Sequence, residues 1–407
     1  MFYIIGIIIA FFLALLLLGK KNKTLADKIL FAWLMVIGMH LSLFVARSVS
    51  GNINFAFLLG IEIPFPLLHG PFLYLYTAAM TNQLPSNKNW GLVHFIIPAL
   101  SLLMLLGFFM LPANEKVEIY RKKGAGYETQ MSINHIAIYI SGIFYVALCI
   151  MLLRKHRKNI EEQFSFTEKI NLNWLRYLVY GIGLIWLVVI ASSDFWVFGA
   201  VVVFILLLGF FGIKQVGIFT QTHQVKEHRM DPFSTTVSSV KETGNNLSNQ
   251  TFNIENALHV SERPFISDIT LNQPLTEEED ISIVRRKYAK SGLTDLESDR
   301  IHAELIKLMA TSKIFTEPEL TLTELATRLA IHANYLSQVV NEREGKNFYD
   351  YINSLRIEEF KNLVGLPENK KYTILTLAFE CGFNSKSSFN RYFKKVTGLS
   401  PSEYIHN

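Results

Sequence analysis

The sequence predicts an all-α protein in three parts: a polytopic helical membrane domain, a flexible linker and a helical C-terminal domain. Half of the 407 residues are hydrophobic and the mean hydropathy is +0.26, which is unusual for a soluble chain. Long apolar runs recur up to residue 213, and a polar stretch follows them. Two segments near the C-terminus share one layout of helix, tight turn and helix.

Seven apolar runs in the first half each approach the length needed to cross about 30 Å of hydrocarbon. They are Phe2–Leu18, Leu25–Ala46, Phe57–Met80, Leu92–Leu111, Ile133–Leu153, Leu175–Ile190 and Phe195–Ile213. The first run has no basic segment before it and no small-residue cleavage site after it, so we expect a retained helix rather than a signal peptide. Residues 1–213 are therefore predicted to form a seven-helix transmembrane domain.

The distribution of Lys and Arg predicts the orientation of these helices. The odd-numbered loops and the stretch after the seventh run are rich in both, whereas the fourth loop mixes them with glutamates. Loops rich in Lys and Arg remain on the cytoplasmic side. We therefore expect the N-terminus outside, the C-terminus in the cytoplasm, and a multi-pass location in a bacterial cytoplasmic membrane.

A few ionisable residues fall within or beside the apolar runs and predict an outward-facing site for a signal. With this orientation Glu62, His69 and Asp194 lie in the outer half of the membrane, as does His40. Such groups usually face a cavity or pair with one another, so there are two interpretations. These residues form a ligand-sensing pocket, or they lie at the headgroup level or make structural hydrogen bonds between helices. Three prolines in Glu62–Pro71 also predict a kinked or irregular third helix.

Residues 214–292 are predicted to be a flexible cytoplasmic linker. The segment is rich in Ser, Thr, Asn, Gln and Glu and has no long apolar period. It cannot bury enough apolar surface to offset the chain entropy lost on folding. Order is expected to resume at Leu293, with a helix that Thr294 or Asp295 caps.

The C-terminal domain, residues 293–407, is predicted to contain two helix-turn-helix units at about 321–341 and 373–395, joined by a long helix over Phe348–Val364. Apolar spacing assigns one face of each second helix to the core and leaves short polar and basic side chains facing outward, as base edges and phosphates require. The candidate DNA-binding residues are Asn334, Ser337, Gln338, Lys386, Ser387, Asn390, Arg391 and Lys394.

This stretch resembles the C-terminal domain of the AraC/XylS family of transcription regulators. The residues that carry the resemblance are Leu325-Ala326, Asn334–Ser337, Leu355-Arg356, Ala378–Phe383, Phe389 with Phe393, and Gly398–Tyr404. Phe360 and the ending Ile405–Asn407 depart from the family pattern. The order of apolar helices, linker and this domain is similar to membrane-anchored AraC-like regulators of Bacteroidetes-type bacteria, which implies a one-component sensor.

We therefore predict a membrane-bound, sequence-specific transcription regulator and no enzyme. The expected partners are promoter DNA, the lipid bilayer and an unidentified small-molecule or envelope signal, with RNA polymerase and a second copy of the chain as further candidates. No catalytic pair, metal-ligand set or cofactor motif is apparent, and Cys149 and Cys381 are expected to be buried free thiols. The alternatives are a transporter or enzyme with an accessory DNA-binding domain, a mere membrane tether, and a regulator released by proteolysis in the linker.

Overall fold

The computed structural model describes residues 2–49, 57–85, 87, 89–167, 170, 172–191, 194–214 and 292–406. These residues form helices and turns and contain no strand; one isolated antiparallel bridge joins Phe164 and Thr321. The all-α prediction is therefore confirmed for the described residues. The predicted linker falls almost entirely on residues 215–291, outside the described part of the chain.

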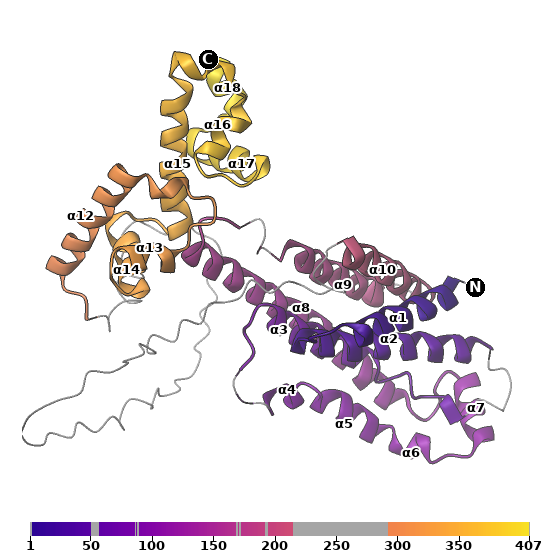
Figure 1. Cartoon of the computed structure of the whole chain (residues 1–407). Coiled ribbons are helices and arrows are strands. Elements are labelled where there is room, and N and C mark those ends of the chain that lie inside the picture. Colours follow the sequence, from indigo (N-terminus) through magenta and orange to yellow (C-terminus); the bar gives the residue numbers. More distant parts are fainter. Residues whose placement is uncertain are drawn as a thin grey trace, which may run out of the picture. The chain divides into compact units, whose positions relative to one another are not determined.

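Six helices in the N-terminal region pack into a closed ring (Figure 1). In ring order they are α1 (Phe2–Gly19), α2 (Leu25–Val49), α3 (Pro66–Met80), α8 (Glu128–Gln163), α9 (Asn173–Ala191) and α10 (Asp194–Lys214), and α10 packs back against α1. Each helix thus contacts its neighbours in the ring, and one continuous apolar core joins them.

The outside of this ring is also apolar. Several of its large aliphatic side chains are more than 60% exposed, namely Ile8, Leu15, Ile140 and Leu184. In a water-soluble protein, such side chains would be more stable if they were buried. α1, α2, α8 and α9 are long and apolar enough to cross a membrane, and Trp90–Met104 and Asp194–Gly209 are shorter apolar helical stretches. A surface of this kind is typical of helices that face lipid.

The third and fourth apolar runs differ from the single helices that the sequence predicts. Leu59–Phe65 is a series of turns and α3 begins only at Pro66, where a missing N–H is tolerated in the first helical turn. The run Leu92–Leu111 is divided into α4 (Trp90–Val93), α5 (Ile96–Met104) and α6 (Leu106–Phe109). Pro98 lies in the first turn of α5, which favours a helix start there over a helix interior. A further helix, α7 (Ala113–Arg121), occupies the predicted fourth loop.

In the C-terminal region, the long helix α15 (Phe348–Val364) has the bounds that the sequence predicts, and two separate cores form on its two halves. Phe348, Tyr351 and Ile352 pack with α12 (Asp295–Ser312), α13 (Leu322–Arg328) and α14 (Ala333–Arg343). Ile357 and Phe360 pack with α16 (Ile374–Glu380) and α17 (Lys386–Thr397). The short elements η2 (Ile314–Thr316), η3 (Pro367–Lys371) and α18 (Pro401–His406) complete the region.

Arg356 on α15 is the largest buried charged side chain in this region, at 1% exposed. Its guanidinium donates to the carbonyl oxygens of Phe315 at 2.7 Å and Glu317 at 2.6 Å. It also donates to the carbonyl and hydroxyl oxygens of Ser165, at 3.3 and 3.2 Å. A buried charge must be compensated by such bonds, so Arg356 joins α15 to the turn around η2 and to the segment that follows α8.

Two turns in the C-terminal region use left-handed backbone at equivalent positions. Gly382, after α16, has φ +96°, and Ala330, after α13, has φ +54°. A Cβ at Gly382 would lie 2.6 Å from the carbonyl oxygen of Thr316. Glycine is thus required at residue 382 for both conformation and space.

Replacing Gly382 with alanine should destabilise the C-terminal region by about 2–4 kcal/mol, because strain in the left-handed backbone adds to the clash with Thr316. Thermal unfolding of the purified chain in detergent, followed by circular dichroism, measures this. Gly365→Ala is the matched control, since Gly365 has φ −69° and a Cβ there would meet only ordinary contacts of 3.5–3.6 Å. Equal melting temperatures for the two variants would contradict the role assigned to Gly382.

Candidate nucleic-acid interface

The second helix pair, α16 and α17, presents a basic and polar face. Thr373 caps α16 by accepting from the backbone N–H of Thr376, and Ser385 caps α17 by accepting from that of Ser388. Phe389 and Phe393 are buried on one side of α17. The opposite side exposes the five residues predicted from the sequence: Lys386, Ser387, Asn390, Arg391 and Lys394.

Side chains of α17 also contact the start of α15. Lys395 forms an ion pair of 2.7 Å with Asp350, and the hydroxyl of Tyr392 donates to the carbonyl oxygen of Asp350 at 2.7 Å. Burial raises the pKa of Tyr392 above its usual range, so this hydroxyl remains a donor. Arg391 donates to the hydroxyl of Tyr349 at 3.3 Å. These bonds fix the orientation of α17 against α15.

The first helix pair, α13 and α14, differs from the sequence prediction at one residue. Asn334 is exposed and Ser337 half-buried, but Gln338 is buried, at 7% exposed, and donates to Glu342 at 3.1 Å. The prediction that Gln338 faces outward is therefore wrong. Gln338 lies next to Val339 on the buried face of α14. Its side-chain N–H donates to Glu342, one helical turn later, which satisfies this donor locally.

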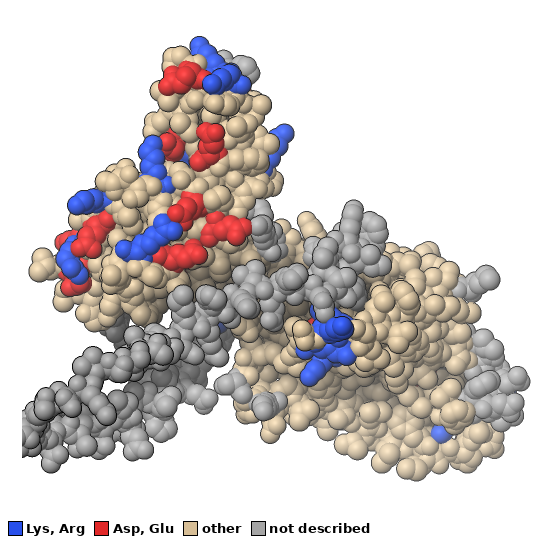
Figure 2. Space-filling view, viewed as in Figure 1, with Lys and Arg blue, Asp and Glu red and all other residues tan. Residues whose placement is uncertain are grey.

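The charge of the first pair is balanced by nearby ion pairs. Arg328 on α13 binds Glu317 through two hydrogen bonds of 2.9 and 2.8 Å, and Arg343 on α14 lies 3.0 Å from Asp299. In the face shown in Figure 2, acidic and basic side chains alternate over the C-terminal region. The exposed basic side chains that are suited to bind nucleic acid therefore come mainly from α17.

The three residues predicted to sense a signal line one cavity of about 340 Å³ inside the ring of N-terminal helices. Glu62, His69 and Asp194 lie on its wall, together with His40 and His135. Apolar and aromatic side chains, including Trp33, Trp186 and Phe198, form most of the remainder. The structure thus brings these sequence-distant polar groups together.

The same polar groups also make hydrogen bonds within the ring. The indole N–H of Trp33 donates to Nδ1 of His69 at 3.3 Å, and Nε2 of His69 lies 3.1 Å from Nδ1 of His40. Which of the two imidazoles donates in the His69–His40 contact depends on their tautomers. Glu62 accepts from the hydroxyl of Tyr120 at 2.7 Å and from the N–H of Gly60 at 3.0 Å. These residues thus line a cavity and also form hydrogen bonds within the ring, and their role in sensing a signal stays a prediction.

Sequence reasoning did not identify two contributors to this cavity. Asn134 and Tyr139 on α8 line it, and Asn134 donates to the carbonyl oxygen of Ile63 at 3.1 Å while accepting from Ser101 at 2.6 Å. A polar residue inside an apolar run was the available signal for Asn134.

Cys149 and Cys381 are buried free thiols, as expected, and burial raises the pKa of Cys381 to about 12. Within the described residues no group of three or more His, Cys, Asp or Glu side chains is placed to hold a metal ion.

The C-terminal region belongs to a known class of domain. Residues 325–407 match the family model described as "Helix-turn-helix domain", of the AraC type. The same stretch is similar to proteins described as HTH-type transcriptional regulators.

Several similar proteins are HTH-type transcriptional regulators that are described as uncharacterized. YobQ of Bacillus subtilis is 36% identical over 85 residues, which are 21% of this chain and 34% of YobQ. YijO of Escherichia coli is 35% identical over 85 residues, 21% of this chain and 29% of YijO. YtdP of Bacillus subtilis is 32% identical over 88 residues, 22% of this chain and 11% of YtdP. The similarity thus covers about a third or less of each relative, and no solved structure gives a significant match.

Replacing Glu62 with leucine should destabilise the N-terminal helices by roughly 2 kcal/mol, because the Tyr120 hydroxyl and the Gly60 N–H lose their acceptor in a buried place. Glu62→Gln keeps an acceptor oxygen and should cost less than half as much. The melting temperature of the purified chain in detergent measures the difference. Glu118→Leu is the control, since Glu118 is exposed and pairs with exposed Lys122; a Glu62→Leu variant as stable as this control would contradict the assigned role.

Proposed function

We propose that the chain is a membrane-bound, one-component transcription regulator that reads DNA through two helix-turn-helix units. The observation that carries this proposal is the repeated layout of α13–α14 and α16–α17. Thr321 and Thr373 cap the first helices, Ala330 and Gly382 supply the left-handed residue of each turn, and both pairs of positions lie 52 residues apart. Most of the repeat lies within the residues that match the helix-turn-helix model, and each copy forms its own core with α15.

In this proposal the two helix-turn-helix units make different contacts with DNA. Lys386, Arg391 and Lys394 of α17 contribute phosphate contacts, while Ser387 and Asn390 contact base edges. Asn334 and Ser337 contribute to base or phosphate contacts from α14. Gln338 is left out, because its side chain is buried. The second unit then provides most of the affinity, and the first adds selectivity or orientation.

We further propose that residues 1–213 form a transmembrane sensor, residues 214–292 a linker and residues 293–407 the DNA-binding domain. The apolar outer surface of the helix ring and the apolar length of α1, α2, α8 and α9 support membrane insertion. The Lys and Arg in the odd-numbered loops support a cytoplasmic C-terminus in a bacterial cytoplasmic membrane. The proposed partners of the chain are therefore promoter DNA and the lipid bilayer.

The cavity inside the ring is the proposed signal site, with Glu62, His69 and Asp194 as its polar contacts. Its size and its apolar wall with a few polar groups are typical of small-molecule sites. α8 contributes Asn134 to this cavity and leads to Ser165, which bonds to Arg356 in the C-terminal region. A ligand that displaces α8 would therefore change contacts made by the DNA-binding domain.

Asn390→Ala should weaken binding to a target promoter fragment by about 5–100-fold and relax the preference at one base pair, since a base contact is worth roughly 1–3 kcal/mol. Lys386→Ala should weaken binding to all DNA sequences alike. It should also reduce the slope of the logarithm of the binding constant against the logarithm of salt concentration by about one. Fluorescence anisotropy on the reconstituted chain, with sites selected from genomic fragments, measures both effects. Lys307→Ala, an exposed lysine on α12, is the control; no preference for any sequence over bulk DNA would disprove the proposal.

Topology can be tested with reporter fusions that are active on only one side of the membrane. Alkaline phosphatase fused after Gly126 should be active and fused after Gln163 inactive, with the reverse pattern for a fluorescent protein that matures in the cytoplasm. The reason is that α8 crosses the membrane between these residues in the proposed orientation. Activity of the phosphatase at both positions would contradict the orientation.

A further inference from the structure

The short segment that follows α8 is buried against the C-terminal region. Ser165, in this segment, is 1% exposed. Its N–H and its hydroxyl donate to the carbonyl oxygen of Leu320, at 3.2 and 2.8 Å. Its carbonyl oxygen accepts from the side chains of Asn353 at 3.0 Å and Arg356 at 3.3 Å. Every polar group of Ser165 is therefore bonded to the C-terminal region.

The residues on either side of this serine make further contacts. Phe164 forms an antiparallel bridge with Thr321, the residue that caps α13. Thr167 is 8% exposed, and Arg391 of α17 donates to its hydroxyl at 3.5 Å. Residues 164–167, here called the docking segment, thus contact the start of α13 in the first helix-turn-helix unit and α17 in the second.

The side chains of α15 that receive the docking segment are themselves buried. Asn353 and Arg356 are each 1% exposed, and Arg356 also donates to the carbonyl oxygens of Phe315 and Glu317. Buried donors of this kind require acceptors. Water can supply those acceptors when the docking segment leaves, so each bond contributes little net stability. Docking is therefore a contact that a modest change elsewhere in the chain can reverse.

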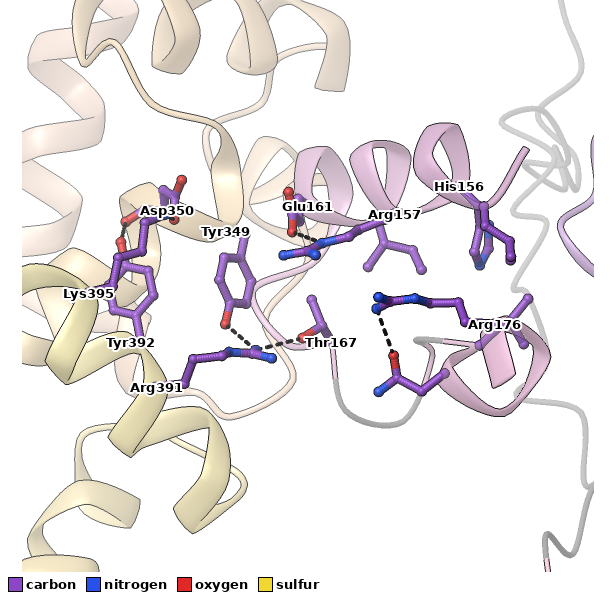
Figure 3. A pocket seen from close by; sticks show the side chains of 14 residues that line it. His156, Arg157, Glu161, Thr167, Arg176, Tyr349, Asp350, Arg391, Tyr392 and Lys395 are labelled. Atoms are coloured by element: carbon purple, nitrogen blue, oxygen red, sulfur yellow. Dashed lines mark hydrogen bonds and ion pairs between the residues drawn. The ribbon is translucent and has the colours of Figure 1, made fainter. Parts of the chain in front are cut away.

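A second cavity, of about 270 Å³, lies beside the docking segment, where the ends of α8 and α9 face α17 (Figure 3). Arg391 and Lys395 of α17 line one side of it, and Arg157 and Arg176 line the other. An α-helix is about 10–12 Å across with its side chains and fills a major groove about 12 Å wide, so DNA backbone passes close to both flanks of the helix. This cavity is smaller than most small-molecule sites. A strand of several nucleotides therefore does not fit beside Arg391 while the segment is docked.

We propose that the docking segment holds the C-terminal region in a DNA-free arrangement, so that docking and DNA binding exclude each other. In helix-turn-helix proteins the first helix crosses the DNA backbone and the second enters the major groove. The docking segment contacts one helix of each kind, and the ends of α8 and α9 occupy one flank of α17. This regulation rests on the proposed DNA-binding function and gives it a direction, because release of the segment permits DNA binding.

The place of the docking segment makes it sensitive to movement of α8. Ser165 comes two residues after α8 ends at Gln163, and Asn134 of the same helix lines the central cavity. A displacement of α8 along its axis by about 1.5 Å, the rise of one residue, would lengthen the bonds of Ser165 beyond hydrogen-bonding distance. A ligand in the central cavity that moves α8 would therefore release the segment.

A disulfide can hold the docking segment in place on the full chain in nanodiscs. Residues opposed in an antiparallel bridge have Cα atoms about 4.5–5.5 Å apart, which is within the range of disulfides. Phe164→Cys combined with Thr321→Cys should therefore cross-link under mild oxidation, and both native cysteines are buried and do not compete. Phe164→Cys combined with Asn362→Cys is the control pair and should stay reduced, because Asn362 is exposed near the C-terminal end of α15.

DNA binding by the locked chain is measured by fluorescence anisotropy, with a labelled fragment that the unchanged chain selects from genomic DNA. The oxidised Phe164→Cys/Thr321→Cys chain should bind this fragment at least tenfold more weakly than the same preparation after reduction. Thr321→Cys alone loses the same capping hydroxyl of α13, so it is the control for that loss. Its DNA affinity should not respond to oxidation.

Ser165→Leu tests release of the docking segment without a change in the C-terminal region. The larger apolar side chain does not fit a position that is 1% exposed, so docking should weaken and DNA binding should strengthen at least fivefold. The apparent Kd is the intrinsic Kd divided by the released fraction, so the gain also measures how much of the unchanged chain is docked. Gln163→Leu makes the same change at an exposed position two residues earlier and should have no effect.

Several results would overturn the proposed exclusion. They are cross-linking no faster than in the control pair, DNA affinity of the oxidised chain equal to or above that of the reduced chain, and Ser165→Leu binding DNA no more tightly than Gln163→Leu. Failure of the DNA-binding function itself is distinguishable from these results. In that case neither the reduced chain nor Ser165→Leu would prefer any sequence over bulk DNA, and the regulation would fall with the function even if the disulfide forms.

Discussion

The buried guanidinium of Arg356 is the interaction on which the C-terminal region depends. It is 1% exposed and bonds to carbonyl oxygens around η2 and to Ser165 after α8. A charge withdrawn from water tolerates few missing partners, so its neighbours are held in one arrangement. Arg356 lies between Leu355, which packs against the first core, and Ile357 of the second core, so it joins the middle of α15 to the segment after α8.

Most of the helical framework could be predicted from local sequence patterns. The bounds of α15, the capping residue Thr321 and the buried phenylalanines of α17 follow from apolar spacing and capping rules. Gln338 was assigned to the wrong face, since periodicity places a residue only to within part of a turn. The contact of Ser165 with Arg356 joins residues 191 apart in sequence, and no local pattern encodes such a contact.

The candidate sites were predictable to different degrees. Glu62, His69 and Asp194 stand out as ionisable groups in apolar surroundings, and the ring of helices brings them to one cavity. The cavity lined by Arg157 and Arg176 was not predictable. Arg157 belongs to an ordinary run of charges after one apolar segment, and Arg176 is a single charge at the start of the next. Only the packing of α8 and α9 against α17 places them beside Arg391.

The continuity of α8 has a consequence for how this chain can change in evolution. The helix runs unbroken from Glu128 to Gln163, with Asn134 on the central cavity and Ser165 just beyond its end. Each residue turns a helix by about 100° and advances it by about 1.5 Å, so Asn134 and the helix end at Gln163 are held about 44 Å apart in a fixed rotational phase. Inserting or deleting one residue would turn one contact away from its partner. Length variation in α8 should therefore be tolerated only in near-whole turns, whereas substitutions of one apolar residue by another on its exposed face disturb neither contact.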